Sequence, residues 1–261
     1  IKKNNPENIN NYTYYEPFVG AGAVFFEKKK KKAVINDFNE QLMLTYNVIK
    51  NNVEDLVFLL NEYKKNNNEE YFYEIRNMDR DGAKFAKLSN IEKAARLIYL
   101  NKTCFNGLYR VNSKGFFNVP YGKYKNPAIC EDIVLRQISN YLNLNEIIVL
   151  SNDFEQAVLT ANKNSFIYFD PPYHSPNKTS FSEYQAGGFG ENEQERLRNV
   201  MLKMTNYGIK CLLSNSDTEY IRDLYNNDIF KIISVQAKRV INSNSAGRGS
   251  VNELLIKNWT E

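Results

Sequence analysis

The sequence Asp170-Pro171-Pro172-Tyr173 has residue types that could bind a planar ring carrying an exocyclic amine. It comes directly after the apolar run 165–169, which has the length of a buried strand. The Asp170 carboxylate is a hydrogen-bond acceptor, and the two prolines have no N–H, so the turn presents carbonyls and withholds donors. Two acceptors could take the hydrogens of an amine while Tyr173 stacks on the ring. The alternative is a strand with a proline-rich turn after it, in which Tyr173 is packed in the core.

A second group of residues suits a ligand that contains a nucleoside. Residues 12–16 are β-prone, and Gly20 and Gly22 come next, at the start of a predicted helix. Glycines at such a turn let a ligand approach the backbone and the helix N-terminus. Asp37 ends the next short strand, about 20 residues beyond the glycine turn, which is the place for an acid that binds ribose hydroxyls. Alternatively, Asp37 is the N-cap of a helix over 40–50.

A third acid occurs after another apolar run. Residues 147–150 are predicted to form a buried strand, and Asp153 and Phe154 lie shortly after it. An acid at the carboxyl end of a strand could hold the adenine of a nucleoside cofactor. The alternative is that Asp153 caps a helix over 154–159.

Residues 101–130 contain lysines and an arginine but no aspartate or glutamate, and aromatic side chains are interleaved with the cations. Gly107, Gly115 and Gly122 mark turns, so a loop or β-hairpin is predicted. Cations bind phosphates, aromatic side chains wedge or stack against bases, and Arg or Asn reads base edges. We therefore favour nucleic-acid binding over the alternative, a flap that covers a small-molecule site.

Composition limits the remaining possibilities. The chain has 261 residues, enough for one large domain or a domain with an insertion, and a net charge of +4. No apolar run is long enough to span a bilayer. The cysteines are far apart and match neither a metal site nor a disulfide framework, which fits a reducing compartment. A single histidine, His174, argues against a histidine triad or metal cluster, and a surface position is expected for it.

The other segments are interpreted as scaffold. The lysine run 28–32 is predicted to be the solvated end of a helix, with nucleic-acid contact as the alternative. Helices are expected over 42–66 and 69–101, with a polar break between them. The rest of the prediction is a lid candidate over 174–190, helices over 191–207 and 218–225, strands over 209–213, 229–235 and 253–256, and a flexible loop over 242–250.

Together, these motifs resemble the Dam-type DNA adenine-N6 methyltransferases of bacteria and phages, the α-group or D12 class. The likeness covers nearly the whole chain and is carried by Glu16-Pro-Phe-Val-Gly-Ala-Gly22, Asn36-Asp37, Asn106-Gly-Leu-Tyr-Arg110, Phe117-Asn-Val-Pro120 and Asp170-Pro-Pro-Tyr173. The resemblance implies an α/β fold with a Rossmann-like methyltransferase sheet and a helical and β-hairpin DNA-recognition subdomain. It implies a catalytic domain over 1–52 and 145–261 and a recognition subdomain over 53–144.

The resemblance also implies S-adenosylmethionine as the cofactor and no metal. The implied cofactor contacts are Phe18, Gly20 and Gly22 at the methionine part, Asp37 at the ribose, Asp153 and Phe154 at the adenine, and Asp170 beside them. Asp170 and the Pro171 carbonyl would hold the target amine, and Tyr173 would stack on the target adenine. That adenine has to be flipped out of the duplex, because its N6 is unreachable inside it.

The expected target sequence is GATC in double-stranded DNA. Arg110 matches the residue that reads a guanine of this site, and bidentate Arg–guanine pairing is the commonest specific contact. The other implied DNA contacts are Phe105 as a wedge with Asn106 beside it, Leu108 and Pro120 at flanking bases, and Asn112, Lys123 and Lys125 at phosphates.

The chain departs from the family at its start. The family normally begins with a cofactor-contacting segment of the form Lys-Trp-Ala-Gly-Gly-Lys, which is absent here. Ile1-Lys2-Lys3-Asn4 resembles the residues that come after this segment in the family. We expect a truncated chain rather than impaired cofactor binding, since the other motifs are intact.

A monomer in the cytoplasm of a bacterium or phage-infected cell, near the nucleoid, is expected, with no membrane partner.

Two rival functions are kept. One is methylation of another amine, such as RNA adenine, cytosine N4 or a glutamine side chain. Arg110 favours duplex DNA, and Asp170 in place of Ser or Asn favours adenine. The other is a DNA-binding module with a defunct catalytic fold, against which the intact 170–173 motif argues. A restriction endonuclease partner, a solitary role and a phage role are all compatible with the sequence.

Overall fold

The computed structural model describes residues 4–175, 188–238 and 250–260. Contacts between its residues divide the chain into two compact units. The first consists of Ile1–Phe38 and Asn152–Glu261, and the second consists of Asn39–Ser151. The functional division at 52/53 and 144/145 that the family resemblance implies stays a prediction.

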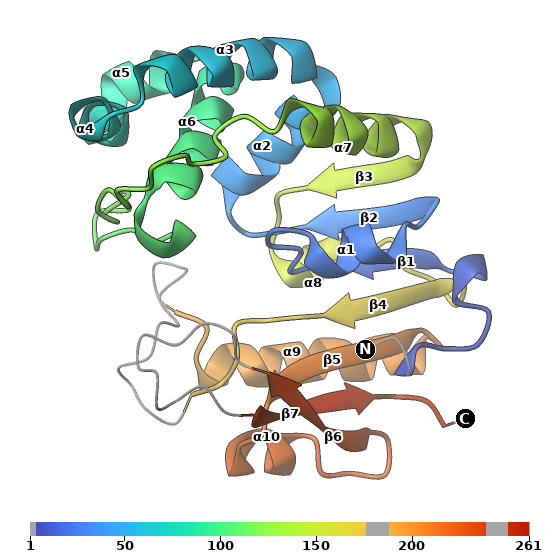
Figure 1. Ribbon diagram of the computed structural model, residues 1–261. Coiled ribbons are helices and arrows are strands. Elements are labelled where there is room, and N and C mark those ends of the chain that lie inside the picture. Colours follow the sequence, from blue (N-terminus) through green and yellow to red (C-terminus); the bar gives the residue numbers. More distant parts are fainter. Residues whose placement is uncertain (1–3, 176–187, 239–249, 261) are drawn as a thin grey trace. The chain divides into compact units, whose positions relative to one another are not determined.

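The first unit is built on a mixed sheet whose strands are β1 (Thr13–Glu16), β2 (Lys32–Asn36), β4 (Ser165–Phe169), β5 (Lys210–Ser216), β6 (Lys231–Lys238) and β7 (Ser250–Lys257). They lie in the order β2-β1-β4-β5-β7-β6, parallel from β2 to β5 and antiparallel on both sides of β7 (Figure 1). The helices of this unit are α1 (Ala23–Lys28), α8 (Phe154–Ala157), α9 (Glu191–Asn206) and α10 (Glu219–Leu224), with a 3₁₀ turn at Ile9–Asn11. Helices that alternate with parallel strands confirm the predicted Rossmann-like α/β fold.

The strand order reverses between β1 and β4. From β1 the chain passes through α1 to β2 on one side, whereas β4 and β5 lie on the other side. Ligands of open α/β sheets bind at such a switch point, outside the carboxyl ends of the strands. Glu16 pairs with Ile35 and Tyr15 with Ile167 in parallel register. The turns after β1, β2 and β4 therefore all leave the sheet at the carboxyl ends of the strands. The predicted cofactor and catalytic residues begin there.

The second unit is mainly helical and contains α2 (Glu40–Asn51), α3 (Val53–Asn66), α4 (Glu69–Asn77), α5 (Gly82–Lys87), α6 (Asn90–Thr103), α7 (Asp132–Leu144), the strand β3 (Glu146–Leu150) and 3₁₀ turns at Met78–Arg80 and Phe105–Gly107. Helix α6 packs against α2, α3 and α4, and the buried side chains at their contacts include Leu56, Leu60, Phe72, Tyr99 and Leu100. This unit thus has a hydrophobic core of its own.

The predicted long helices are wrong in their continuity. The chain leaves the helical conformation at Asn52, where φ is −137°, and this residue separates α2 from α3. In the second helical segment Asp81 accepts a hydrogen bond from the Lys84 amide, and Ser89 forms a reciprocal capping box with Glu92. These side chains satisfy backbone groups locally and start new helices, which hydrophobic spacing does not report. The predicted polar break is confirmed, since Asn68 caps α4.

Three further expectations need correction. The lysine run is not wholly solvated, because Lys30 is buried and its Nζ donates to the Ile9 carbonyl at 2.6 Å. Strand β3 is not buried along its length, since Ile148 is 55% exposed. His174 is not a surface group; its side chain is 11% exposed. For Lys30 and His174 a tertiary partner, rather than the local sequence, accounts for the burial.

Candidate active site and DNA-reading segment

Asp170 lies directly after β4 in the first unit. Its Oδ1 accepts a hydrogen bond of 2.6 Å from Ser214 Oγ on β5, and the Tyr173 hydroxyl also stabilises its charged form. Burial raises the pKa of Asp170, while the hydrogen bonds from Ser214 and Tyr173 oppose the shift. Ser214 and Tyr173 therefore hold the carboxylate at the switch point of the sheet, where it can accept hydrogen bonds from a ligand.

The turn after Asp170 is fixed by side chains from α9 and β5. Gln194 is fully buried, and its Nε2 donates to the Pro172 carbonyl at 2.9 Å. The Asn215 side chain accepts from the His174 amide at 3.0 Å. The Tyr173 hydroxyl lies 3.4 Å from Glu253 Oε2 on β7, so this ring packs against the strand ends. The predicted catalytic residues Asp170, Pro171 and Tyr173 thus stand in one anchored turn.

Glu16 is a buried acid at the same carboxyl end of the sheet, and sequence analysis assigned it no role. It is 2% exposed, and its Oε2 accepts a hydrogen bond of 2.6 Å from the Tyr14 hydroxyl. Burial raises the pKa of Glu16 to about 8, the hydrogen bond from Tyr14 lowers it, and the charge of Asp170 raises it further. Glu16 consequently carries a proton at neutral pH. Its place next to Pro17 at a strand end was the available sequence signal.

The glycine turn and Asp37 are joined in the structure. Gly20 has a φ of +50°, and its N–H donates to Asp37 Oδ2 at 3.0 Å. A Cβ atom at Gly20 would have no neighbouring atom within 4 Å, so this face of the turn is open. The alternative prediction, in which Asp37 caps the next helix, is wrong, because Asn39 accepts the bond from the Leu42 amide.

Asn36 ties together three turns of the first unit. It is 1% exposed, and its Nδ2 donates to the carbonyls of Pro17 and Asn152 at 3.0 and 2.9 Å. Its Oδ1 accepts from the Asn152 amide at 2.8 Å. Both ends of one side-chain amide therefore hold the glycine turn, the Asp37 turn and the start of α8 in fixed positions. Sequence analysis placed Asn36 at the strand end without this role.

Aromatic rings form a wall beside the glycine turn. Phe18 lies 5.3 Å from Phe154 and 5.6 Å from Phe189, and Phe154 lies 5.9 Å from Phe189, measured between ring centroids. The predicted cofactor residues Phe18 and Phe154 are thus brought together. Phe189 was missed, because it falls in the predicted lid 174–190, of which residues 176–187 lie outside the described part of the chain. The flexible loop predicted over 242–250 lies outside it too, except for Ser250 at the start of β7.

Asp153 has structural partners. Its Oδ1 accepts from the Glu155 amide at 2.9 Å, so it is the N-cap of α8, as the alternative interpretation predicted. It also forms an ion pair with Arg196, whose guanidinium lies 4.4 Å from the centroid of the Phe154 ring. The carboxylate therefore orients α8 and Phe154, and a contact with a cofactor stays a prediction.

The segment predicted to read DNA belongs to the second unit and forms a hairpin-like loop, as expected. Two isolated antiparallel β-bridges pair the backbone of Cys104 with that of Tyr121 and the backbone of Val111 with that of Phe117. All predicted DNA contacts are exposed, namely Phe105, Asn106, Leu108, Arg110, Asn112, Pro120, Lys123 and Lys125. Phe105 is 52% exposed, whereas Phe117 on the other side of the loop is 2% exposed. Apolar side chains held in water beside cations are a surface suited to bases and phosphates.

Two of these predicted contacts also have partners within the loop. Arg110 Nε donates to Asn118 Oδ1 at 2.7 Å. Asn112 Oδ1 accepts from the amides of Lys114 and Phe116 at 3.0 and 3.1 Å, so this side chain shapes the tip of the hairpin. The loop is thus pre-shaped by its own side chains.

A buried ionic cluster supports the hairpin, and sequence analysis missed it. Asp79 is 7% exposed and lies 2.7 Å from both Arg80 and Arg96. Asp79 Oδ2 accepts from the Phe117 amide at 3.0 Å, and Arg80 donates to the Phe117 carbonyl at 2.6 Å. Both backbone groups of Phe117 are therefore held by charged side chains, which fixes the segment that carries Asn118.

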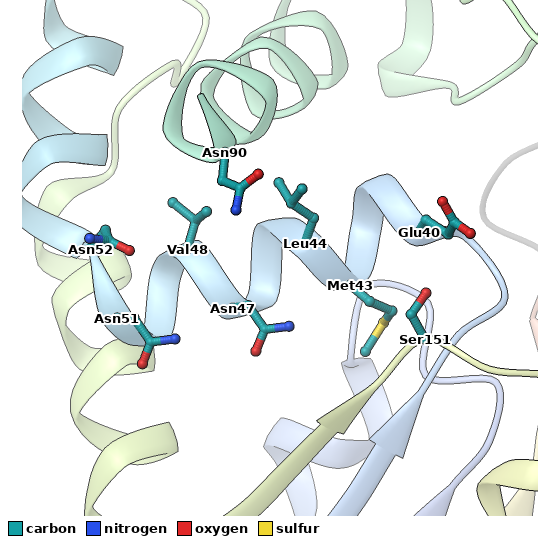
Figure 2. A pocket seen from close by; sticks show the side chains of 9 residues that line it. All are labelled: Glu40, Met43, Leu44, Asn47, Val48, Asn51, Asn52, Asn90 and Ser151. Atoms are coloured by element: carbon teal, nitrogen blue, oxygen red, sulfur yellow. The ribbon is translucent and has the colours of Figure 1, made fainter. Parts of the chain in front are cut away.

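A hollow of about 390 Å³ lies elsewhere in the second unit (Figure 2). Its lining is rich in amides and consists of Glu40, Met43, Leu44, Asn47, Val48, Asn51, Asn52, Asn90 and Ser151. None of the predicted site residues lines it.

The described residues hold no cluster of His, Cys, Asp or Glu that could bind a metal and no helix able to span a membrane.

Comparison with known proteins gives a consistent result. Residues 1–241 match the family model of the D12 class N6 adenine-specific DNA methyltransferases. The Type II methyltransferase M1.LlaDCHI of Lactococcus lactis subsp. cremoris is 44% identical over 97% of this chain and 88% of its own length. The Type II methyltransferase M.MjaIII of Methanocaldococcus jannaschii is 40% identical over 99% and 93%. The DNA adenine methylase of Haemophilus influenzae is 34% identical over 92% and 82%.

The Rossmann-like α/β sheet is the fold expected of a methyltransferase. The chain belongs to the D12 class of N6 adenine-specific DNA methyltransferases.

Proposed function

We propose that this enzyme methylates adenine N6 within GATC in double-stranded DNA, with S-adenosylmethionine as the methyl donor. The observation that carries the proposal is Asp170, a partly buried carboxylate fixed by Ser214 at the switch point of the sheet. Family membership supports adenine as the target, and the exposed cationic and aromatic hairpin supports DNA. We further propose that the enzyme acts in the cytoplasm of a bacterium or phage-infected cell.

The residues at the sheet edge fit the proposed cofactor. The open face at Gly20 leaves room for a ligand against the backbone, and Asp37 next to it offers a carboxylate to ribose hydroxyls. Phe18 and Phe154 offer apolar faces. When bound, S-adenosylmethionine supplies an activated methyl group. The proposed contacts are Phe18, Gly20, Gly22, Asp37, Asp153, Phe154 and Asp170.

The catalytic turn would act by positioning and by charge placement. The Asp170 carboxylate and the Pro171 carbonyl would accept the two hydrogens of the target amine, which aims its lone pair at the donor methyl. Tyr173 would stack on the flipped adenine. The Pro172 carbonyl is already held by Gln194, so the turn that carries the proposed acceptors does not need to reorganise during the reaction.

The hairpin would supply sequence selection. Arg110 would read a guanine, Phe105 would wedge into the base stack beside Asn106, and Leu108 and Pro120 would contact flanking bases. The remaining proposed contacts, Asn112, Lys123 and Lys125, would bind phosphates. Arg110 is exposed and braced by Asn118, which is the state required of an arginine that enters a groove.

The direct test is methyl transfer from labelled S-adenosylmethionine to matched duplexes that contain GATC or the permuted site GTAC. N6-methyladenine is expected in the GATC duplex alone, identified by nucleoside analysis. Methylation of the permuted duplex at equal rate would remove the GATC assignment and leave the family activity. No N6-methyladenine in any DNA, or label in cytosine or RNA instead, would overturn the proposed function.

A further inference from the structure

Strands β4 and β5 are neighbours in the sheet (Figure 1). Asp170, directly after β4, is one end of a chain of side-chain hydrogen bonds that joins these two strands. Phe169 pairs with Leu213 in parallel register, which sets Ser214 of β5 beside Asp170. Ser214 is 2% exposed, and its Oγ lies 2.6 Å from Asp170 Oδ1. The Tyr168 hydroxyl lies 2.9 Å from the same Oγ, and Tyr168 is 1% exposed.

The available protons give this chain a direction. An ionised carboxylate only accepts hydrogen bonds, so the single proton of Ser214 has to point at Asp170. The Tyr168 hydroxyl must then donate to Ser214, because the serine proton is already used. The order Tyr168 to Ser214 to Asp170 is thus fixed whenever Asp170 is charged. It anchors one oxygen of the carboxylate and, with it, the plane of the group.

We propose that Ser214, aligned by Tyr168, is the positioning residue that keeps the Asp170 carboxylate ionised and oriented toward the target amine. This inference rests on the proposed role of Asp170. Ser214 would not contact the substrate itself. Its chemistry is that of a buried hydroxyl that donates to a charged acceptor, and such bonds are among the stronger ones in proteins.

The surroundings of Asp170 explain why a donor is needed there. Two acidic residues on other strands belong to these surroundings: Glu16 at the end of β1, whose pKa the charge of Asp170 raises, and Glu253 on β7, which contacts the Tyr173 hydroxyl. The cation Lys28 acts on Glu16. Burial raises the pKa of Asp170, and the donors that oppose this are Ser214 first and then Tyr173. Removal of the Ser214 hydroxyl leaves the effect of burial less opposed, so the carboxyl should protonate at a higher pH.

The test is the pH dependence of methyl transfer in a single turnover, with enzyme in excess over a GATC duplex and saturating S-adenosylmethionine. In Ser214→Ala the acid limb should move to higher pH by about one unit, which is about tenfold in rate at any pH on that limb. Tyr168→Phe should move it in the same direction by less, because Ser214 is kept but loses its alignment. DNA binding and the unfolding midpoint measured in parallel verify that both variants fold.

Ser216→Ala is the matched control, since this serine lies on the same strand and donates to the His174 carbonyl rather than to Asp170. Its acid limb should coincide with that of the parent enzyme. A uniform loss of rate in Ser214→Ala, without displacement of the acid limb, would indicate a merely structural role and overturn the inference. If the parent enzyme makes no N6-methyladenine, the proposed function fails first, and that outcome is distinct from an unmoved acid limb.

Discussion

Asp170 is partly buried and accepts hydrogen bonds from Ser214 and Tyr173. Both properties affect its pKa and therefore the response of the enzyme to pH. A carboxylate that accepts hydrogens from an amine has to be ionised. Because burial raises the pKa of Asp170, that ionisation is lost at a higher pH than for an exposed aspartate. Activity should therefore be full at alkaline pH and decline as the pH falls through the raised pKa.

Replacement of this residue separates chemistry from binding. Asp170→Ala should abolish methyl transfer while most of the DNA affinity remains, because phosphate contacts supply most of that affinity. The measurements are a radiolabel transfer assay and equilibrium binding to a fluorescent duplex at fixed salt concentration. Residual transfer close to that of the parent enzyme would remove Asp170 from the proposed mechanism.

Arg110 is the residue on which sequence selection depends in our proposal. Arg110→Ala should relax the preference for the guanine by about 1–3 kcal/mol. The quantity to compare is kcat/KM on GATC and on a duplex with that guanine replaced. Lys123→Ala is the control, since loss of a phosphate contact should weaken binding to both duplexes equally and reduce the salt dependence. An unchanged ratio in Arg110→Ala would refute the assignment.

At the scale of elements, the hairpin depends on the buried cluster of Asp79, Arg80 and Arg96. Asp79→Ala would leave Arg96, which is 1% exposed, without its carboxylate partner. The expected loss is about 3–5 kcal/mol in the free energy of unfolding, measured with urea. Asp132→Ala, which removes an exposed partner of Arg136, should cost less than about 1 kcal/mol. Similar losses in the two variants would contradict the role of the cluster.

The same elements show what the sequence could predict. The strands, the glycine turn and the acid-Pro-Pro-Tyr turn are local patterns of apolar and turn residues, and the structure contains them where expected. The Asp79 cluster joins residues far apart in the chain, as does the pair of Ser214 and Asp170. Such pairs have no local pattern, because any of several buried polar residues could have met. Helix breaks at Asn52 and Ser89 were missed because capping acts through single side chains.

At the scale of the whole molecule, Glu16 couples folding to pH. Its pKa of about 8 in the folded chain lies above the ordinary value of 4.5 for a glutamate. The folded state therefore binds the extra proton, and the associated stability is complete below pH 4.5 and is lost as the pH rises through 8. Glu16→Gln should be as stable as the parent at about pH 5 and more stable at about pH 9, by a few kcal/mol.

Urea unfolding at these two pH values provides the comparison, and the difference between parent and variant isolates the contribution of Glu16 from that of all other groups. Glu195→Gln on the exposed side of α9 is the control and should track the parent at both values. A constant difference between Glu16→Gln and the parent across this pH range would show that Glu16 does not titrate as described.

The insertion of the second unit between the two parts of the first has a consequence for synthesis on the ribosome. Thr13 in β1 pairs with Ser165 in β4, whereas Asn39–Ser151 is continuous and has its own core. Strand β1 can therefore pair only with β2 while the inserted unit is translated, because β4 has not yet been made. A nascent chain arrested before Ser165 has emerged should resist protease over 39–151 and be cut readily before residue 39. Equal protection of both segments would show that the first unit does not need β4.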